Sequence, residues 1–414
     1  MKRFSIQDKC RVNTNKEADT FVGIKCEDGD ISINFPLGYD VSYDDDKELH
    51  KDILLLFNTI RTTTGRRDSE IENGHKAYNE TAFPIQAYMS VIYDFYARGY
   101  YKERERKHNV ARRGKINWNR TIKTQKPCIQ NGNAFYLDFI VNKNTINSDQ
   151  MITHIHEYCV YESFSKIGWL FTSSMPERPK IKFNERLFRT VLKEKIGSTY
   201  NDKNKALFLS MLAIIDYRGS NCKNKNFKYG TYRFEYVWED LIDRVYGILN
   251  KQDYFPVTYW KVAEKEYSNA PLEPDTIMIY NGNVYVLDAK YYKYGATKEV
   301  KDLPESTSIN KQITYAEYIA EQEKYTKIHG EGFKVYNAFL MPFNSIGNNW
   351  RTNGNLLRIG EAYGEWKSNK KSYEKVQGIL IDVKHLMKIS TRQNLDEIIS
   401  LANKIQQYVE RENV

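Results

Sequence analysis

Two aspartates and a lysine stand at the ends of an apolar hairpin. Asp275 precedes the apolar run TIMIY, Asp288 follows the run VYVL, and Lys290 comes two residues later. The pair Asn281-Gly282 between the runs is the strongest short-range signal for a two-residue β-turn. With these residues in the turn, counting outward along both strands places Asp275 directly opposite Asp288. Lys290 falls on the same face by the strand period of two.

This group of charges fits a divalent metal ion and a phosphate. Two carboxylates about 5 Å apart in apolar surroundings repel each other and lose hydration, so they need a cation. Mg²⁺ binds a few carboxylates together with water and phosphate oxygens, and it activates the bound water as a nucleophile. A neighbouring lysine orients or deprotonates the water and neutralises charge on the phosphate. The pattern predicts metal-dependent hydrolysis of nucleic acid, with Asp275 and Asp288 as ligands of Mg²⁺ or of Mn²⁺ in its place.

A simpler interpretation of the same residues stays open at this point. Asp275 is then a solvated side chain at a strand start, and Asp288 with Lys290 is an ordinary ion pair at a strand end. Both runs are apolar at consecutive positions, however, which is typical of strands buried on both faces. Charges at the ends of such strands are costly to keep, so the pattern favours the metal site.

The elements around the hairpin indicate an α/β core from about residue 220 onward, a mixed central sheet flanked by helices. Apolar residues at helical spacing predict a helix over 234–249. The other expected elements are a helix at about 310–327, strands at 333–341 and 376–383, and a helix from about 393.

The N-terminal half reads as an α+β region followed by helices. Residues 20–42 alternate apolar and polar residues around an Asp-Gly turn, which predicts a hairpin. Helices are expected at about 46–62, 83–101, 184–196 and 202–216, with another helical region from Ser148. We therefore predict an N-terminal α+β domain with a basic segment (1–147), a helical connector (148–217) and the α/β domain of the hairpin (218–414).

The charge of the chain is clustered. Its 62 Lys or Arg and 53 Asp or Glu give a net charge of +9, which permits a polyanionic partner. Eleven Lys or Arg against two acids lie between residues 98 and 126, and five more basic residues lie in an expected loop over 218–233. The longer run fits a DNA-contacting track, a docking surface for a partner protein, or a solvated helix and loop.

Several function classes are excluded by missing patterns. The five cysteines are scattered without a C-x-x-C pair, which is typical of a reduced cytoplasmic protein. No apolar run is long enough to span a membrane, and the start MKRFSIQDKC holds no apolar leader, so we expect no membrane association. His154 and His156 are two apart on an expected helix and cannot grip one metal ion. No G-x-x-x-x-G-K-[ST] phosphate loop is present, so the chain is not an NTP-driven motor.

The hairpin residues resemble the PD-(D/E)xK nuclease motif, through Pro274-Asp275 and Asp288-Ala289-Lys290. This resemblance implies a restriction-endonuclease-like core in the third segment, with a glutamate from the preceding helix completing the metal site. The expected helix offers Glu235 and Glu239, and we favour Glu235 because its Phe-Glu pair resembles that of the family.

Some of these nucleases also use a glutamine and a tyrosine on a later helix. The resemblance therefore adds Gln312 as a candidate catalytic residue, although neither Tyr315 nor Tyr318 stands at the usual Q-x-x-x-Y spacing.

A broader resemblance covers about residues 83–320. The order of YARGYYKERERKHNVARRGKINWNRTI, HIHEYCVYESFSKIGWLF, YRFEYVWEDLI and the hairpin is similar to the McrC-like subunits of the LlaJI restriction family. In McrC-type proteins an R-G-x-I-like stretch, here Arg113-Gly114-Lys115-Ile116, ends a basic segment that joins the N-terminal domain to the nuclease.

This resemblance implies a Mg²⁺-dependent DNA endonuclease subunit that cuts foreign double-stranded DNA together with a McrB-like AAA+ GTPase. Two alternatives stay open. One is a stand-alone, type II-like restriction endonuclease that needs no GTP. The other is a noncatalytic subunit that docks on the GTPase and stimulates it.

Overall fold

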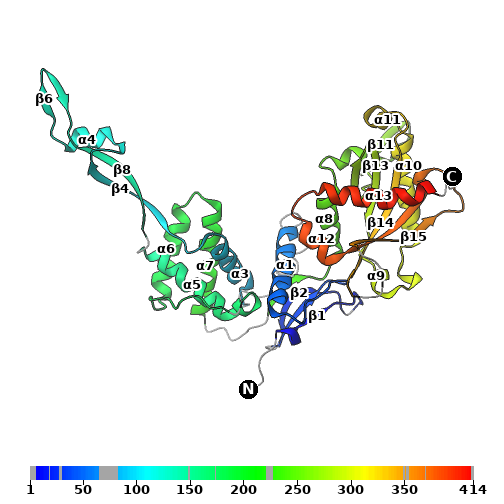
Figure 1. Cartoon of the computed structure of the whole chain (residues 1–414), viewed down its shortest axis with the longest axis horizontal. Coiled ribbons are helices and arrows are strands. Elements are labelled where there is room, and N and C mark those ends of the chain that lie inside the picture. The colour runs from blue at the N-terminus through cyan, green and yellow to red at the C-terminus, as the bar shows by residue number, and fades with distance from the viewer. Residues whose placement is uncertain are drawn as a thin grey trace. The chain divides into compact units, whose positions relative to one another are not determined.

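The computed structural model describes residues 6–17, 19–27, 30–64, 83–147, 150–172, 174–220, 227–347, 350, 354–368 and 370–411. These residues belong to two compact units (Figure 1). Unit 1 comprises residues 1–79 and 228–414, and unit 2 comprises residues 80–227. The three-segment division at residues 147 and 217 stays a prediction about domains, and the compact units divide the chain at other positions.

The centre of unit 1 is a mixed sheet of five strands. Their order is β12 (Thr276–Tyr280), β13 (Asn283–Ala289), β14 (Val335–Phe343), β16 (Lys375–Asp382) and β15 (Leu356–Tyr363). β13, β14 and β16 run parallel, whereas the outer strands β12 and β15 pair antiparallel with their neighbours. The predicted mixed sheet is confirmed. The sequence did not reveal β15, because its residues are mostly half-buried and include charged side chains.

Helices cover both faces of this sheet, which confirms the α/β class. On one face, α10 (Ser306–Glu321) packs Tyr315 and Ile319 against Val286. On the other face lie α8 (Phe234–Tyr246) and α13 (Leu395–Arg411), where Gln406 Nε2 donates to Tyr285 Oη at 2.6 Å. The expected single helix over 310–327 is two helices, α10 and α11 (Glu323–His329), since Gln322 between them is extended.

The N-terminal residues form a second sheet of unit 1. Its order is β1 (Cys10–Val12), β3 (Asp30–Phe35), β2 (Val22–Glu27) and β9 (Phe227–Thr231), followed in sequence after β3 by α1 (Asp46–Thr64). The antiparallel pair β2–β3 confirms the predicted hairpin, whose turn lies outside the described residues. Part of the expected loop over 218–233 is instead the strand β9.

Buried contacts join the N-terminal sheet to the central sheet of unit 1. The Leu37 N–H donates to Tyr291 Oη at 2.6 Å. Tyr291 directly follows Lys290 in the sequence. On α12 (Val383–Ile389), Lys384 pairs with Asp52 at 2.9 Å. Because both contacts are buried or nearly so, the N-terminal sheet is fixed to the sheet that carries the hairpin.

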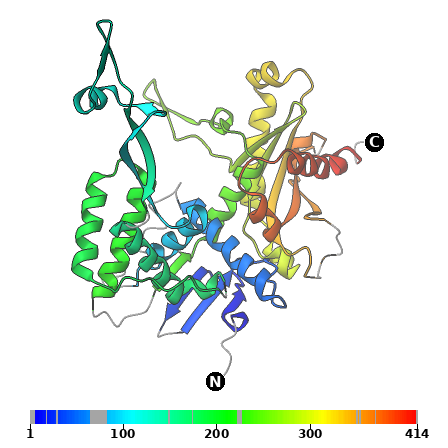
Figure 2. The same ribbon diagram turned by 60° about the vertical axis from the view of Figure 1, so that its left-hand side comes forward.

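Unit 2 consists of helices and a long ribbon. The helices are α3 (Ile85–Arg98), α5 (Met151–Ile167), α6 (Glu185–Ser198) and α7 (Asp202–Gly219), close to the predicted positions. The ribbon pairs β4 (Glu103–Ala111) with β8 (Phe139–Asn147), and its tip holds β5 (Lys115–Ile116), α4 (Trp118–Thr124), β6 (Cys128–Gln130) and β7 (Asn133–Phe135). Figure 2 shows this ribbon extending beyond the helices of the unit. The basic run over 98–126 is therefore mostly ribbon and tip, rather than helix and loop.

No helix among the described residues has the length and apolar composition that a membrane span requires.

Candidate active site

The hairpin of β12 and β13 has the predicted register. Asn281 and Gly282 both have left-handed backbone angles, φ 49° and 73°, as a type I′ turn requires. The ladder pairs Tyr280 with Asn283 at the turn and Thr276 with Leu287 at the other end. One step further along each strand stand the two aspartates that the sequence placed opposite each other.

Asp275, Asp288 and Lys290 come together at this end of the hairpin, on the sheet face that α10 covers. Asp275 Oδ2 accepts a hydrogen bond from the Ala289 N–H at 2.9 Å, which ties the two strand ends together. Asp288 Oδ2 lies 2.7 Å from Lys290 Nζ, and the two side chains are 5% and 19% exposed. The lysine is thus held against a buried carboxylate.

Burial and mutual repulsion make the aspartate pair costly in its charged form. Loss of solvent, followed by the charge of Asp288, raises the pKa of Asp275 from 3.8 to about 6, against the opposing effects of the Ala289 N–H, Lys290 and Lys311. Burial lowers the pKa of Lys290, but the ion pair with Asp288 and the charge of Asp275 outweigh it and raise that pKa. Lys290 is therefore a protonated ammonium at neutral pH.

The two carboxylates fit a divalent cation. Apart from the ion pair with Lys290, the buried Asp288 Oδ2 has no hydrogen-bond partner among the described residues. A cation between Asp275 and Asp288 would supply that partner and remove their repulsion, and carboxylate oxygens are the ligands that Mg²⁺ prefers. The described residues contain no cluster of three or more His, Cys, Asp or Glu side chains placed to hold a metal. Water and substrate oxygens can complete the coordination of such a cation.

The two predicted helix glutamates come from the helix that precedes the hairpin in sequence. Glu235 and Glu239 are both on α8, and Glu235 lies near Tyr291, the residue after Lys290, because its charge adds to burial in raising the pKa of Tyr291. Glu235 is ion-paired with Arg233, whose Nε lies 2.8 Å from Glu235 Oε1. The structure does not bring either glutamate into a three-carboxylate group with Asp275 and Asp288.

Gln312 is buried between α10 and the sheet. Its Nε2 donates to the Val286 carbonyl oxygen at 2.7 Å, and the residue is 1% exposed. This bond pairs a strand carbonyl and fixes α10 beside β13. The side-chain amide of Gln312 is therefore hydrogen-bonded to the backbone of Val286, which lies two residues before Asp288.

Sequence reasoning missed Lys311, the residue before Gln312. Lys311 is exposed on α10, and its positive charge is among the effects that lower the pKa of Asp275. It thus adds a second cation beside the carboxylates. No local pattern marks it, because its relation to Asp275 arises only when α10 packs on the sheet.

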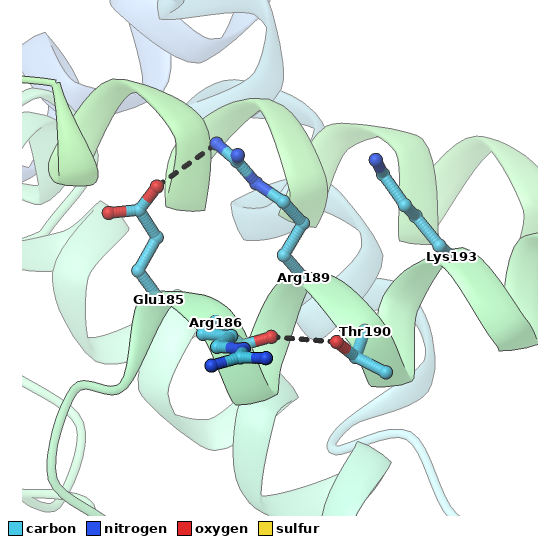
Figure 3. A pocket seen from close by; sticks show the side chains of 5 residues that line it. All are labelled: Glu185, Arg186, Arg189, Thr190 and Lys193. Carbon is cyan, nitrogen blue, oxygen red and sulfur yellow. Dashed lines mark hydrogen bonds and ion pairs between the residues drawn. The ribbon is translucent and has the colours of Figure 1, made fainter.

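A separate surface hollow of about 400 Å³ lies on α6 in unit 2 (Figure 3). Its lining consists of Glu185, Arg186, Arg189, Thr190 and Lys193. Arg189 is neutralised by Glu185 at 3.1 Å and by Asp216 at 2.7 Å. The hollow offers cations without a pair of carboxylates, so it does not compete with the hairpin as a hydrolytic site.

Comparisons with known proteins relate this chain to restriction enzymes. The model of the LlaJI restriction endonuclease family matches residues 21–356. The chain is also similar to a component, YdjA, of the type II restriction enzyme BsuMI from Bacillus subtilis (strain 168). The two are 26% identical over 281 residues, which cover 62% of this chain and 58% of the relative. The chain thus aligns with little more than half of that relative's length. Because the family model covers most of the sequence, this chain belongs to the LlaJI restriction endonuclease family.

Proposed function

We propose that the chain is the DNA-cleaving subunit of a restriction system, a Mg²⁺-dependent endonuclease with a PD-(D/E)xK-type core that cuts foreign double-stranded DNA. One observation carries this proposal: the Asp288–Lys290 ion pair lies opposite Asp275 at the end of a buried hairpin. Its residue types match the needs of phosphodiester hydrolysis, and the chain belongs to a restriction endonuclease family.

In this proposal Asp275 and Asp288 hold the metal ion, Mg²⁺ or Mn²⁺. When bound, the ion supplies an activated water and stabilises negative charge on the phosphate. Lys290 stays protonated, so it orients the water or a phosphate oxygen and offsets charge rather than accepting a proton. Lys311 offers a further cation to the phosphate. Glu235, Glu239 and Gln312 stay predictions as parts of this site.

Asp275 sets a pH requirement for this mechanism. With a pKa of about 6 in the metal-free protein, its carboxyl is largely protonated below that pH and a poor metal ligand. Metal binding therefore releases a proton at acidic pH, and the affinity for metal falls as the pH drops below about 6.

We further propose that the subunit acts with an AAA+ GTPase. The sequence itself has no phosphate-binding loop, and the similar protein from Bacillus subtilis is named as one component of its enzyme. The ribbon tip of unit 2 supports a docking role because it exposes large apolar side chains, such as Trp118, Ile129 and Phe135. Six Lys or Arg against one acid, Asp138, lie between residues 111 and 139, which also suits DNA phosphates.

The name of that relative favours a second candidate. A component of a type II restriction enzyme suggests that this chain cleaves DNA as part of an assembly of subunits; in this second candidate we propose that no GTP is needed. The aspartate pair has the same role in both candidates, and only the partner differs.

The test is plasmid cleavage by the purified full chain in Mg²⁺ or Mn²⁺, with and without the candidate GTPase and GTP. Asp288→Ala is the matched inactive control. Cleavage only with GTPase and GTP supports the proposed subunit, and cleavage without GTPase and GTP supports the second candidate. If the wild-type chain never cleaves DNA but still binds the GTPase, the noncatalytic alternative replaces both.

A further inference from the structure

An exposed β-hairpin projects from unit 1 directly before the strand that carries Asp275. Strands β10 (Tyr259–Val262) and β11 (Lys265–Ser268) form it, and every residue from 257 to 273 is exposed. We call residues 257–273 the arm. Figure 2 shows its yellow-green strands extending away from the five-stranded sheet. The proposed cleavage chemistry does not use this segment.

The root of the arm is fixed firmly to the candidate active site. Pro256 and Pro274, which flank the arm, are buried, and Tyr254 packs in the same apolar cluster as Val286. The Leu272 N–H donates to the Pro256 carbonyl oxygen at 2.8 Å, so the two segments of the arm are hydrogen-bonded to each other at its root. Asp275 follows three residues after Leu272. The position of the arm is therefore coupled to the position of the aspartate pair.

The two faces of the arm differ in chemistry. Cross-strand pairs Trp260–Tyr267 and Val262–Lys265 share one face, here called the aromatic face. Its three large apolar side chains, Trp260, Val262 and Tyr267, are 65%, 55% and 55% exposed. The opposite face carries Tyr259–Ser268 and Lys261–Glu266. Lys265 is the one charged side chain of the strands on the aromatic face, which thus has no acid.

A two-stranded hairpin without a covered face is marginally stable in water. The arm exposes aromatic area that a monomeric soluble protein ordinarily covers, so a partner is expected to cover it. The arm as a whole carries two Lys against three Glu, so its charge is not what favours DNA. A face of aromatic and aliphatic side chains without an acid suits a nucleic acid, whose sugars and bases pack on the rings. The major groove admits a two-stranded ribbon, and the minor groove accepts apolar wedges.

We propose that the aromatic face of the arm contacts duplex DNA beside the phosphate that is cleaved, and thereby positions the DNA on the aspartate pair. From Pro256 to the turn at Ala263 the ribbon spans about 23 Å, at about 3.3 Å per residue. This length corresponds to about seven base pairs, given a rise of about 3.4 Å per pair. The contact therefore lies within about one helical turn of the cleaved bond. The inference rests on the proposed function, since it takes DNA as the substrate.

The experiment compares the two faces of the same arm in the full chain. The test variant is Trp260→Ala with Tyr267→Ala, and the matched control is Tyr259→Ala with Ser268→Ala on the opposite face. Binding of a short fluorescent DNA duplex is measured by anisotropy, with Ca²⁺ in place of Mg²⁺ to prevent cleavage. We expect the test variant to bind about tenfold or more weakly, because it loses two rings on which bases or sugars stack, and the control to change by less than about twofold.

Thermal unfolding and sedimentation complete the comparison. Both variants should unfold at the wild-type temperature, because the replaced side chains are exposed. Equal DNA affinity in the test variant and the wild type overturns the proposal. It is also overturned if the wild-type chain self-associates, the test variant is monomeric and the DNA affinities are equal, because a second copy then covers the aromatic face.

Cleavage assays separate this inference from the proposed function. If the wild-type chain cleaves DNA and the test variant binds and cleaves equally well, the arm proposal alone fails. If the wild-type chain never cleaves but the test variant loses DNA affinity, the arm contact stands and the nuclease proposal fails.

Discussion

The two units of this protein differ most in where they place charge. Unit 2 has 25 Lys or Arg against 13 Asp or Glu, a net charge of +12, whereas unit 1 has 37 against 40, a net charge of −3. The total of +9 hides this division. A uniform basic surface would attract a polyanion everywhere, but here the attraction is concentrated in the unit that lacks the aspartate pair.

The two units also differ in how far key side chains are buried. In unit 1 Asp288 is buried beside Lys290, and all nine residues of the central strand β14 are buried. The ribbon tip of unit 2 leaves Trp118, Ile129 and Phe135 open, at 52%, 77% and 51% exposure. Metal chemistry needs dehydrated carboxylates on a rigid sheet, and electrostatic attraction needs solvated bases.

The largest expected effect is loss of cleavage in Asp288→Asn. The change removes a proposed metal ligand and the partner of Lys290 while keeping the shape of the side chain. We expect plasmid cleavage to fall by about 10³-fold or more, the scale set by losing an electrostatic element of a catalytic site.

DNA binding is the control for this variant, together with Glu331→Gln, which removes an exposed charge from the same unit. Duplex affinity in Asp288→Asn should stay within about twofold of wild type, because a single carboxylate adds no attraction to phosphates. Cleavage at the wild-type rate would remove the aspartate pair from the mechanism.

Charge removal at the ribbon tip tests the role of unit 2. Replacing Arg113, Lys115 and Arg120 by Gln should weaken duplex binding about tenfold or more at 0.1 M salt and lower the salt slope by up to about three. The comparison variant replaces the exposed Lys327 and Lys388 of unit 1, and it should change affinity little. Unchanged DNA affinity with lost GTPase binding would assign the tip to the partner protein instead.

The pKa of Asp275 predicts a pH-dependent stability. Because its pKa of about 6 lies above the ordinary 3.8, the folded metal-free protein holds this proton more tightly than the unfolded chain. The contribution of Asp275 to the unfolding free energy therefore falls as the pH rises from about 4 to about 6, and stays level above that.

Asp275→Asn should remove this cost. We expect the metal-free variant to be more stable than wild type at pH 8, by on the order of 1–3 kcal/mol, with a smaller difference at pH 5. Urea unfolding at both pH values measures it, and added Mg²⁺ should stabilise the wild type alone. A variant that is less stable than wild type at pH 8 would show that the Ala289 N–H bond outweighs the repulsion.

The smallest expected effect belongs to Gln312→Leu. The change leaves the Val286 carbonyl without its buried donor, so we expect a loss of about 1–2 kcal/mol in unfolding free energy. Cleavage per folded molecule should change by only a few-fold if the glutamine serves to fix α10. Gln322→Leu, at the exposed junction of α10 and α11, is the control. Abolished cleavage at unchanged stability would make Gln312 a catalytic residue, as the motif resemblance implies.

Local signals predicted the part of the site that lies on one hairpin. An Asn-Gly turn fixes the register of its two strands, so the facing of Asp275 and Asp288 follows from counting residues. The basic run at 98–126 was also visible, but not its ribbon, because β4 alternates charges rather than apolar residues and lacks the usual strand pattern. The sequence analysis also did not predict the arm, because its two short strands lack a regular alternation of apolar and polar residues.

The sequence by itself determined the hairpin, the charge clusters and the helices with strong periodicity, since each depends on residues that are close in the chain. Only the tertiary structure decided that Lys311 lies near Asp275, that Glu235 lies near Tyr291, and that Leu37 and Asp52 of the N-terminal segment contact the C-terminal part of unit 1. These relations join segments far apart in sequence, and they depend on which face of a sheet each helix covers. No local propensity encodes that choice, because it is made by the packing of apolar faces over the whole unit.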